Sequence, residues 1–465
     1  RARGQVSPEW VGWEQFRELM EAPPLREFQA SVVRCRKSES PEERRAAFQE
    51  LKSSGPGLIT LGIRFGDLDS QGSDFWRAAN KRLSDVLVGL EILEHVGVDV
   101  RWEGSDLHLH AAEIHRSDAP FRLVRKMRAS FVAMGALLAR VGTARIGVPG
   151  GCAFGPRPVD RHIDAFEALG VTIQEVDGDF VAERHGPIEG HVRFEEPTVG
   201  GTQNVLLASA LGSRRVVIEN AALEPEVEDL IDLLNAMGAR ISGAGTPVLS
   251  IEGVDTLHGT TFTPIPDRIE AGTFLLATAA TRGRTRLRNV RADHLGAVID
   301  VLRSSGVWID VQGDVLDVDA AGPLHATDVV ATPYPGFPTD LQAPMGAFLA
   351  TVPGSATIRD DVYPDRFTHV EELQKLEARL TMEDRTLHVE GAALKAGQVH
   401  AADIRAGGAL VVATLAAEGT SHLTGVGFLD RGYEHLVERL GALGAHVERR
   451  GTPKDGEPTF LHVPQ

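Results

Sequence analysis

The chain has 465 residues, which is too long for one hydrophobic core and indicates about two domains or an architecture of repeated units. Its net charge of −17 argues against nucleic acid as a partner, because phosphate contacts need a basic surface. The sequence contains no run of 18 or more apolar residues that could span a membrane. It has only two cysteines, Cys35 and Cys152, which fits a reducing compartment. We therefore expect a cytoplasmic protein. An anionic small-molecule substrate is compatible with the net charge if Arg and Lys side chains converge in a cleft.

The N-terminal region contains an extension and then a predicted strand. Residues 1–22 are rich in Trp and Glu and lack the apolar core of a signal peptide. Residues 23–38, PPLREFQASVVRCRKS, have the pattern of a strand, and residues 40–43 have the cap, proline and glutamate of a helix start. Lys37 would then lie beside a helix N-terminus, which suits a phosphate. The residue types alone favour a solvated, charged face equally well.

A short phrase recurs along the rest of the chain. In each copy an apolar helix end is followed by Gly, then by a small or β-branched residue, and then by a strand. The copies are HVGVDV at Gly97, ALGVTI at Gly170, AMGARI at Gly238, SSGVWI at Gly306 and ALGAHV at Gly444, with a degenerate copy, KLEARL, at Glu377. A Gly just past a helix accepts the left-handed conformation that ends it. Six copies about seventy residues apart predict small α/β units gathered into two lobes of three, because solenoid repeats are shorter.

Eight longer phrases follow one another in the order that is typical of one enzyme family. They are KMRAS (126–130), PGGCAFGPRPVDRH (149–162), PTVGGTQN (197–204), ENAALEPEVEDL (219–230), IPDRIEAGTF (265–274), PYPGFPTDLQ (333–342), DRFTHVEEL (365–373) and DRGYE (430–434). From residue 24 to its end the chain resembles the UDP-N-acetylglucosamine enolpyruvyl transferases, and more distantly the enolpyruvylshikimate phosphate synthases. The resemblance implies a two-lobed, inside-out α/β barrel of six βαβαββ-like units, three per lobe.

The resemblance also implies that one lobe is inserted into the other. Residues 37–264 would form the inserted lobe, which carries the nucleotide-binding segments and the loop around Cys152. Residues 23–36 and 265–465 would form the other lobe, on the side of phosphoenolpyruvate. The hinges are expected near Lys37 and Pro264.

The reaction of this family sets the chemical requirements of the site. Protonation of phosphoenolpyruvate at C3 makes C2 electrophilic, a hydroxyl of the acceptor attacks C2, and loss of a proton and of phosphate restores the enol ether. The site therefore needs an acid, a base, and cations for the phosphate and the carboxylate of the donor. This scheme requires no metal ion and no cofactor.

Arginine is suited to the donor because its planar group binds carboxylate and phosphate in a bidentate manner. A single arginine without context is more often a solvated or ion-paired surface residue. By motif matching, the resemblance assigns Arg157 and Arg431 to the phosphate, and Arg366, Arg405 and again Arg431 to the carboxylate. It assigns Lys37 to the position of the catalytic lysine, beside the donor.

Three further residues receive roles from the resemblance. Cys152, in the glycine-rich phrase GGCAFG, matches the loop cysteine that is linked to proton delivery and product release and is the target of fosfomycin. A lone Cys is more often a buried, inert thiol, and Cys35 is assigned that role. Asp340 is the candidate base for the acceptor hydroxyl, although an Asp after Pro-Thr also suits a turn or a helix cap. Asp403 is expected to orient Arg405.

The acceptor site is predicted from two segments that are rich in Pro or Gly. In the family, uracil and ribose are held by the segment that matches residues 157–162, and the diphosphate partly by a loop that matches residues 198–200. The acceptor residues implied by this match are Arg157, Pro158, Val159, Asp160, Thr198, Val199 and Gly200, together with Ser38, Asp340 and the supporting Arg128.

Several departures from the family pattern leave more than one acceptor compatible with the sequence. Ser38 replaces the usual Asn, residues 64–80 replace a short connector, and residues 195–197 lack a common basic residue. The retained nucleotide phrases favour transfer to the 3-hydroxyl of UDP-N-acetylglucosamine in peptidoglycan biosynthesis. The alternative is transfer to the 3′-hydroxyl of UMP in nucleoside-antibiotic biosynthesis. A third hypothesis, motivated by the altered segment around Lys37, is a catalytically silent binding protein of the same fold.

Overall fold

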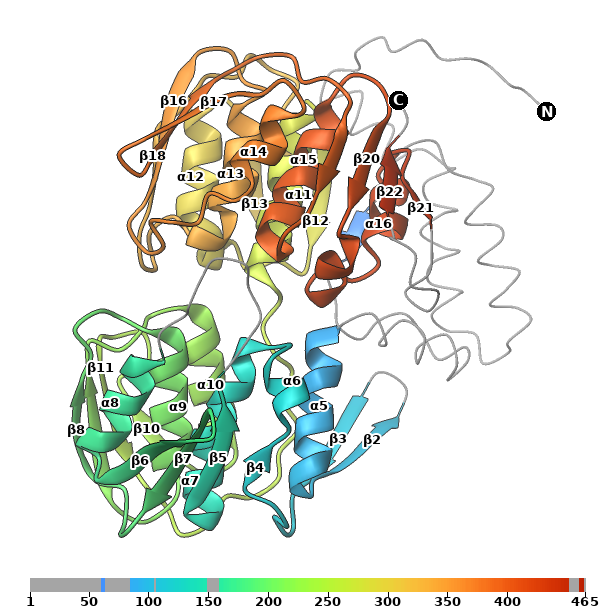
Figure 1. Ribbon diagram of the computed structural model, residues 1–465. Helices are drawn as coiled ribbons and strands as arrows, with labels where there is room; N and C mark the ends of the chain where they lie inside the picture. The colour runs from blue at the N-terminus through green and yellow to red at the C-terminus, as the bar shows by residue number, and fades with distance from the viewer. Residues whose placement is uncertain (1–59, 63–83, 104–105, 149–158, 451–459, 464–465) are drawn as a thin grey trace, which may run out of the picture.

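The computed structural model describes residues 60–62, 84–103, 106–148, 159–450 and 460–463. The predicted site residues Lys37, Ser38, Cys152, Arg157 and Pro158 lie outside this part of the chain, as does Cys35. The described elements form two lobes, each with its own hydrophobic core (Figure 1). None of the described helices is long and apolar enough to cross a membrane.

The first lobe contains the elements from Ser84 to Glu252. They are α5 (Ser84–Val96), β2 (Asp99–Glu103), β3 (Asp106–His110), β4 (Asp118–Ala119), α6 (Phe121–Val124), η1 (Arg128–Val132), α7 (Ala133–Val141), β5 (Thr143–Gly147), α8 (Asp160–Ala168), β6 (Val171–Val176), β7 (Asp179–Arg184), β8 (Gly190–Arg193), α9 (Val199–Ser209), β9 (Arg215–Glu219), α10 (Pro225–Ala236), β10 (Arg240–Ser242) and β11 (Val248–Glu252).

The second lobe contains one early strand and the elements from Arg268 onward. They are β1 (Thr60–Gly62), α11 (Arg268–Ala280), β12 (Arg284–Arg288), η2 (Ala292–Leu295), α12 (Gly296–Ser304), β13 (Trp308–Gln312), β14 (Val315–Asp319), β15 (Val329–Ala331), η3 (Thr339–Leu341), α13 (Gln342–Leu349), β16 (Ser355–Asp360), α14 (Val370–Gln374), β17 (Arg379–Glu383), β18 (Thr386–Glu390), β19 (Gln398–His400), α15 (Ile404–Ala416), β20 (Ser421–Thr424), η4 (Val426–Arg431), α16 (Leu436–Ala442), β21 (Glu448–Arg450) and β22 (Phe460–Val463).

One sheet topology recurs in both lobes. In the order β4-β5-β7-β6 the first pair is parallel and the next two pairs are antiparallel. The sheets β8-β9-β11-β10, β15-β16-β18-β17, β19-β20-β22-β21 and β1-β12-β14-β13 repeat this pattern, whereas β2 and β3 form a two-stranded sheet within the described residues. The α/β class predicted from the sequence is confirmed by these alternating helices and strands.

The turn predicted in each repeated phrase is also confirmed. Every copy follows the end of a helix and adopts a positive φ angle, at Gly97 (111°), Gly170 (79°), Gly238 (97°), Gly306 (92°), Gly444 (92°) and the non-glycine residue Glu377 (62°). The helix therefore ends in the same way even where the glycine is absent. At Gly306 an added Cβ would also lie 2.4 Å from the carbonyl oxygen of Pro323, so both conformation and space require glycine there.

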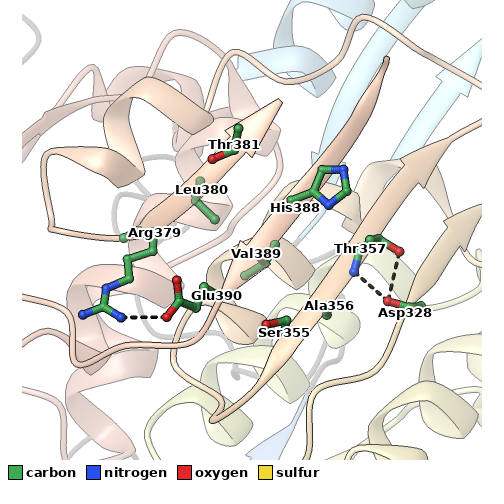
Figure 2. Close-up of a pocket in the computed structure, with 11 residues that line it drawn as sticks. Asp328, Ser355, Ala356, Thr357, Arg379, Leu380, Thr381, His388, Val389 and Glu390 are labelled. Carbon is green, nitrogen blue, oxygen red and sulfur yellow. Dashed lines mark hydrogen bonds and ion pairs between the residues drawn. The ribbon is translucent and has the colours of Figure 1, made fainter. Parts of the chain in front are cut away.

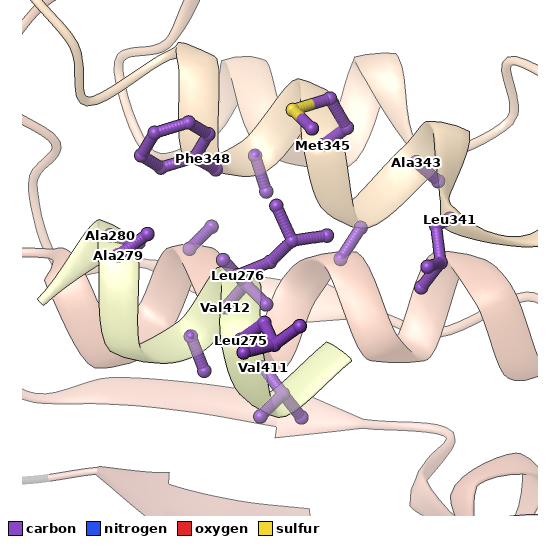
Figure 3. Close-up of a cluster of buried hydrophobic side chains, with 14 of the residues drawn as sticks. Leu275, Leu276, Ala279, Ala280, Leu341, Ala343, Met345, Phe348, Val411 and Val412 are labelled. Atoms are coloured by element: carbon purple, nitrogen blue, oxygen red, sulfur yellow. The ribbon is translucent and has the colours of Figure 1, made fainter. Parts of the chain in front are cut away.

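Helices α11, α13 and α15 lie in the interior of the second lobe. All thirteen residues of α11 and all eight of α13 are buried, whereas strands such as β16 alternate between buried and exposed positions. Figure 3 shows Leu275 and Leu276 of α11, Phe348 of α13 and Val411 of α15 in one apolar cluster. Helices that are apolar on every face are stable only when other elements enclose them.

Strand β1 pairs in the second lobe, although the predicted start of the inserted lobe places it in the first. Residues 60–62 pair in parallel with residues 286–288 of β12, so this strand belongs to a sheet of the second lobe. The prediction of an inserted lobe over 37–264 had placed it in the first lobe. β1 thus lies in the second lobe and α5 in the first, and the chain returns to the second lobe between β11 and α11. The reason is that strand pairing with β12, which lies far along the sequence, decides the lobe to which β1 belongs.

Candidate active site

Three of the predicted residues meet at the face of the second lobe that points toward the first lobe. Asp340 lies in η3, Arg366 precedes α14, and Arg405 lies in the first turn of α15. The Asp340 Oδ1 atom lies 2.7 Å from Nη2 of Arg366 and accepts a hydrogen bond of 3.0 Å from Nε of Arg405. Both guanidinium groups are mostly buried, with side-chain exposures of 8% and 20%. Charge-assisted contacts of this kind are among the strongest polar interactions in proteins.

These contacts determine the charge of Asp340. Burial alone would raise the pKa of its carboxyl group, but the charges of Arg405 and Arg366 outweigh burial and hold that pKa well below its usual range. The carboxylate in turn raises the pKa of Arg405 against the effect of burial. In this structure Asp340 is therefore an ionised partner of two arginines.

The local sequence explains the position of Arg405. Asp403 is fully buried and caps α15, where its Oδ1 accepts hydrogen bonds from the backbone N–H of Arg405 (2.8 Å) and of Ala406 (3.0 Å). Asp403 was expected to orient Arg405. It contacts the backbone of Arg405, while the guanidinium group is held by Asp340. Asp403 therefore fixes the first turn of the helix that carries Arg405.

Arg366 is held by a second set of polar contacts. Its Nη1 donates to Thr339 Oγ1 at 3.2 Å, and the hydroxyl of Thr339 donates to Asp360 Oδ2 at 2.5 Å. The Arg366 guanidinium group also lies 6.0 Å from the ring centroid of Tyr363. The phrases PYPGFPTDLQ and DRFTHVEEL are thereby joined through side chains.

Arg431, the last residue of η4, forms an ion pair across the two lobes. Its Nε donates to Asp85 Oδ1 at 2.9 Å and its Nη2 donates to Asp85 Oδ2 at 3.1 Å. Asp85 lies in the first turn of α5, in the first lobe. None of the recognised phrases contains Asp85. Sequence reasoning therefore missed it, although an acidic residue in the first turn of a helix was a weak signal.

A pocket of about 600 Å³ lies between the lobes and connects the two predicted halves of the site. The second lobe contributes Asp340, Arg405 and Arg268 to its wall, and the first lobe contributes Val199 and Glu226. Arg268 and Glu226 also pair across the lobes, with Nε to Oε1 at 2.8 Å. Val199 of the predicted nucleotide loop thus faces the same cavity as the predicted base.

On the first-lobe side, the buried residue Asn204 joins two of the recognised phrases to η1 and α7. Its Oδ1 accepts from the backbone N–H of Gly135 at 2.7 Å, and its Nδ2 donates to the carbonyl oxygen of Phe131 at 3.1 Å and to His162 Nδ1 at 3.0 Å. Asn204 therefore ties α9 to α8 and to η1, the element that carries Arg128.

His162 is neutral in this network. Burial, and then the charge of Arg128, lower its pKa to about 4. The edge of its ring packs against Phe131, with the centroids 5.1 Å apart. The predicted acceptor side therefore contains an uncharged imidazole that has a hydrogen-bonded asparagine on one side and an aromatic ring on the other.

The remaining predicted acceptor residues lie at the starts of two helices. Thr198 caps α9, with its side chain accepting from the N–H of Gly201 at 3.3 Å, so Val199 and Gly200 form the first turn. Asp160 is exposed at the start of α8, and Val159 before it is buried. Helix starts present N–H groups that suit a diphosphate. Glu196, where a basic residue is usual, pairs with Arg161 of α8.

A second pocket of about 510 Å³ lies on the sheet β15-β16-β18-β17 and contains none of the predicted residues (Figure 2). Arg379 and Glu390 pair there at 2.8 Å, and Asp328 accepts from Thr357. No group of three His, Cys, Asp or Glu residues with the arrangement of a metal site occurs within the described ranges.

Comparison with known proteins finds relatives that cover most of the chain. A UDP-N-acetylglucosamine 1-carboxyvinyltransferase of Thermus thermophilus is 54% identical over 80% of this chain and 87% of its own length. The enzyme of the same name from Deinococcus radiodurans is 52% identical over 79% and 86%.

The chain is also similar to solved structures of enolpyruvyl transferases. The enolpyruvyl transferase NikO from Streptomyces tendae has a TM-score of 0.70 and 25% identity, with 80% of this chain and 89% of that chain covered. An EPSP synthase from Acinetobacter baumannii, at 15% identity and a TM-score of 0.59, covers 83% of this chain and 96% of its own, and shares the fold. The model of the EPSP synthase (3-phosphoshikimate 1-carboxyvinyltransferase) family matches residues 81–440. The chain therefore belongs to the EPSP synthase (3-phosphoshikimate 1-carboxyvinyltransferase) family.

Proposed function

We propose that this protein transfers the enolpyruvyl group of phosphoenolpyruvate to the 3-hydroxyl of UDP-N-acetylglucosamine and releases phosphate. The observation that carries the proposal is the pocket between the lobes, which has Asp340 and Arg405 on one wall and Val199 of the nucleotide loop on the other. The names and high identity of the Thermus and Deinococcus relatives support the same acceptor.

On the donor side, Arg366 and Arg405 bind the carboxylate of phosphoenolpyruvate, and Arg431 binds the donor at its phosphate end and the carboxylate. A proton added at C3 converts the methylene to a methyl group, and the acceptor oxygen forms a bond to C2 as its own proton passes to a base. Loss of one methyl proton and of the phosphate, by cleavage of the bond between C2 and the phosphate oxygen, then gives the product. Arginines at the carboxylate stabilise the charge that develops in this addition.

Asp340 is proposed as the base, and its two arginines determine when it can act. In this structure the Asp340 carboxylate contacts the arginine donors that a substrate carboxylate would use. Binding of phosphoenolpyruvate to Arg366 and Arg405 would replace it and would raise the pKa of Asp340 toward its ordinary value. The base is then released only when the donor is present, beside the hydroxyl group that it must deprotonate.

On the acceptor side, residues 198–200 bind the diphosphate at the start of α9. The sequence segment from Arg157 to Asp160, which includes Pro158 and Val159, is assigned to the uridine. Arg128 and Ser38 complete the acceptor side. Lys37 beside the donor and Cys152 in proton delivery or product release retain the roles implied by the family. The division into an inserted lobe and the arrangement as an inside-out barrel of six units are part of the same proposal.

Two other functions have less support. UMP as the acceptor has less support, because a relative that is named for UDP-N-acetylglucosamine is 54% identical to this chain. A catalytically silent binding protein would not need the buried contacts among Asp340, Arg366 and Arg405. Burying these charges costs desolvation energy, which catalysis would justify.

The direct test is phosphate release from phosphoenolpyruvate with UDP-N-acetylglucosamine, UMP or shikimate 3-phosphate supplied in turn. We expect release with UDP-N-acetylglucosamine. Release with UMP alone would replace this acceptor, and no release with any of the three would contradict the enzymatic function. A Lys37→Ala variant tests the alignment of the N-terminal segment, because an active variant would show that the catalytic lysine lies elsewhere.

A further inference from the structure

Two ion pairs hold the lobes against each other within the described residues, and they differ in their surroundings. Arg268 and Glu226 pair near the segment where the chain returns to the second lobe. Arg431 and Asp85 pair on α5 and η4, which pack against each other. Only the second of these pairs includes an arginine that is assigned to the donor. Its carboxylate partner, Asp85, has no role in the chemistry described above.

The Arg431–Asp85 contact fixes the orientation of the guanidinium group. Asp85 accepts from Nε and Nη2, which form one edge of the planar group, so the opposite edge with Nη1 points away from Asp85. Two parallel hydrogen bonds prevent rotation about the side-chain axis in a way that one bond would not. The Arg431 side chain is 15% exposed and that of Asp85 is 31% exposed, so solvent screens the pair only in part.

Asp85 is itself rigidly placed. It lies in the first turn of α5, where the positive end of the helix dipole stabilises a carboxylate. The same helix buries Val88, Ile92 and Val96 in the core of the first lobe. The carboxylate therefore moves with the first lobe, and Arg431 has its observed orientation only when the two lobes are close.

We propose that Asp85 is a positioning residue that orients Arg431 for phosphoenolpyruvate and makes donor binding depend on the approach of the first lobe. The proposal rests on the function given above, in which Arg431 binds the donor. Asp85 would not touch the donor. Its effect would be on the donor and not on the acceptor, because it acts through an arginine that binds the donor.

A purely structural clamp would behave differently. If Asp85 only held the lobes together, its loss would weaken the binding of both substrates to a similar extent, because both bind in the pocket between the lobes. The decisive readout is therefore the donor KM compared with the acceptor KM, together with rescue by a conservative change.

The test compares Asp85→Asn, Asp85→Glu and Glu91→Gln with the wild-type protein in steady-state assays with phosphoenolpyruvate and UDP-N-acetylglucosamine. Glu91 is the matched control, because it lies on the same helix and pairs with the exposed Arg122 within the first lobe. We expect Asp85→Asn to raise the donor KM about tenfold while the acceptor KM changes less than about twofold. Asp85→Glu should restore part of the loss, and Glu91→Gln should behave as the wild type.

A double variant, Asp85→Asn with Arg431→Lys, adds a test of coupling. We expect its donor KM to be close to that of Arg431→Lys alone, because the aspartate acts through the arginine. Independent, multiplying effects would overturn the proposal, as would equal changes in the two KM values. Thermal unfolding of each variant identifies any general loss of the fold.

Failure of the proposed function can be separated from failure of this inference. If the wild-type protein releases no phosphate with any acceptor, the function fails, and calorimetric titration with phosphoenolpyruvate alone still tests Asp85. Binding about tenfold weaker in Asp85→Asn than in the wild type supports the inference. Equal affinities, or no binding by the wild-type protein, overturn it.

Discussion

The two sides of the candidate site are built on different physical principles. On the second-lobe wall, Asp340, Arg366 and Arg405 are in direct contact as opposite charges. In the first lobe, Asn204 and His162 form a neutral hydrogen-bonded network that does not itself line the pocket. A cluster of charges can exchange one carboxylate for another, whereas a neutral network provides a fixed shape. The donor side is thus suited to an anion that reacts, and the acceptor side to a larger ligand that must be aligned.

The largest expected effect is at Asp340. Asp340→Asn should lower kcat about 1,000-fold because the base is lost. It should also bind phosphoenolpyruvate more tightly than the wild type, because the internal carboxylate no longer competes for Arg366 and Arg405. Steady-state kinetics and calorimetry measure the two effects. Asp361→Asn, which loses an exposed pair with Arg359, is the control. Weaker or unchanged donor binding in Asp340→Asn would show that the charged wall does not work by exchange.

Loss of the Asn204 network in the first lobe should lower the stability of the protein and weaken the binding of the acceptor. Asn204→Ala leaves three buried partners without a hydrogen bond, so we expect a loss of about 4 kcal/mol in the free energy of unfolding and a higher acceptor KM. Denaturant unfolding and acceptor kinetics check this. Asn235→Ala, which removes two hydrogen bonds to Ile241, should lower stability and leave the acceptor KM unchanged. A normal acceptor KM in Asn204→Ala would exclude a role for Asn204 in aligning the nucleotide loop.

The neutral state of His162 gives a pH dependence. Its folded-state pKa of about 4 lies below the ordinary value of 6.5, so the unfolded chain binds more protons between these values. Stability should therefore fall as the pH falls from 6.5 to 4, by at most about 3 kcal/mol from this group. Unfolding measured across this pH range in the wild type and in His162→Gln gives the difference. Equal slopes in the two proteins would contradict a buried, neutral imidazole.

The smallest expected effect is found by comparing the repeat that has Glu377 in place of glycine with a repeat that has the glycine. Glu377 has a φ of 62°, so Glu377→Gly should stabilise the protein by about 1 kcal/mol. Gly306→Ala should destabilise it, because the added Cβ would lie 2.4 Å from the carbonyl oxygen of Pro323. Thermal unfolding of both variants is sufficient. Destabilisation by Glu377→Gly would mean that the Glu377 side chain contributes more than its backbone conformation costs.

The features that the sequence predicted correctly are those that depend on neighbouring residues. The six helix ends follow from a glycine or its substitute shortly after an apolar helix. The contacts of Asp340 with both arginines join two of the recognised phrases to Arg405, which lies outside all eight.

The features that the sequence did not predict depend on pairing at long range. Asp85 and Arg431 are 346 positions apart and meet only because two lobes pack together. The lobe of β1 is decided by its partner β12, so no local pattern could mark where the chain changes lobes. The role of Asn204 likewise depends on the convergence of three segments.

The central claim is transfer of an enolpyruvyl group to UDP-N-acetylglucosamine by addition and then elimination. It is tested most directly by proton NMR of the reaction of phosphoenolpyruvate with this acceptor in D₂O. Because C3 gains a solvent deuteron and then loses one of its three hydrogens, the account predicts an enol ether product that carries deuterium at C3, with one phosphate released per product. No enol ether product, or a product without deuterium at C3, would contradict it.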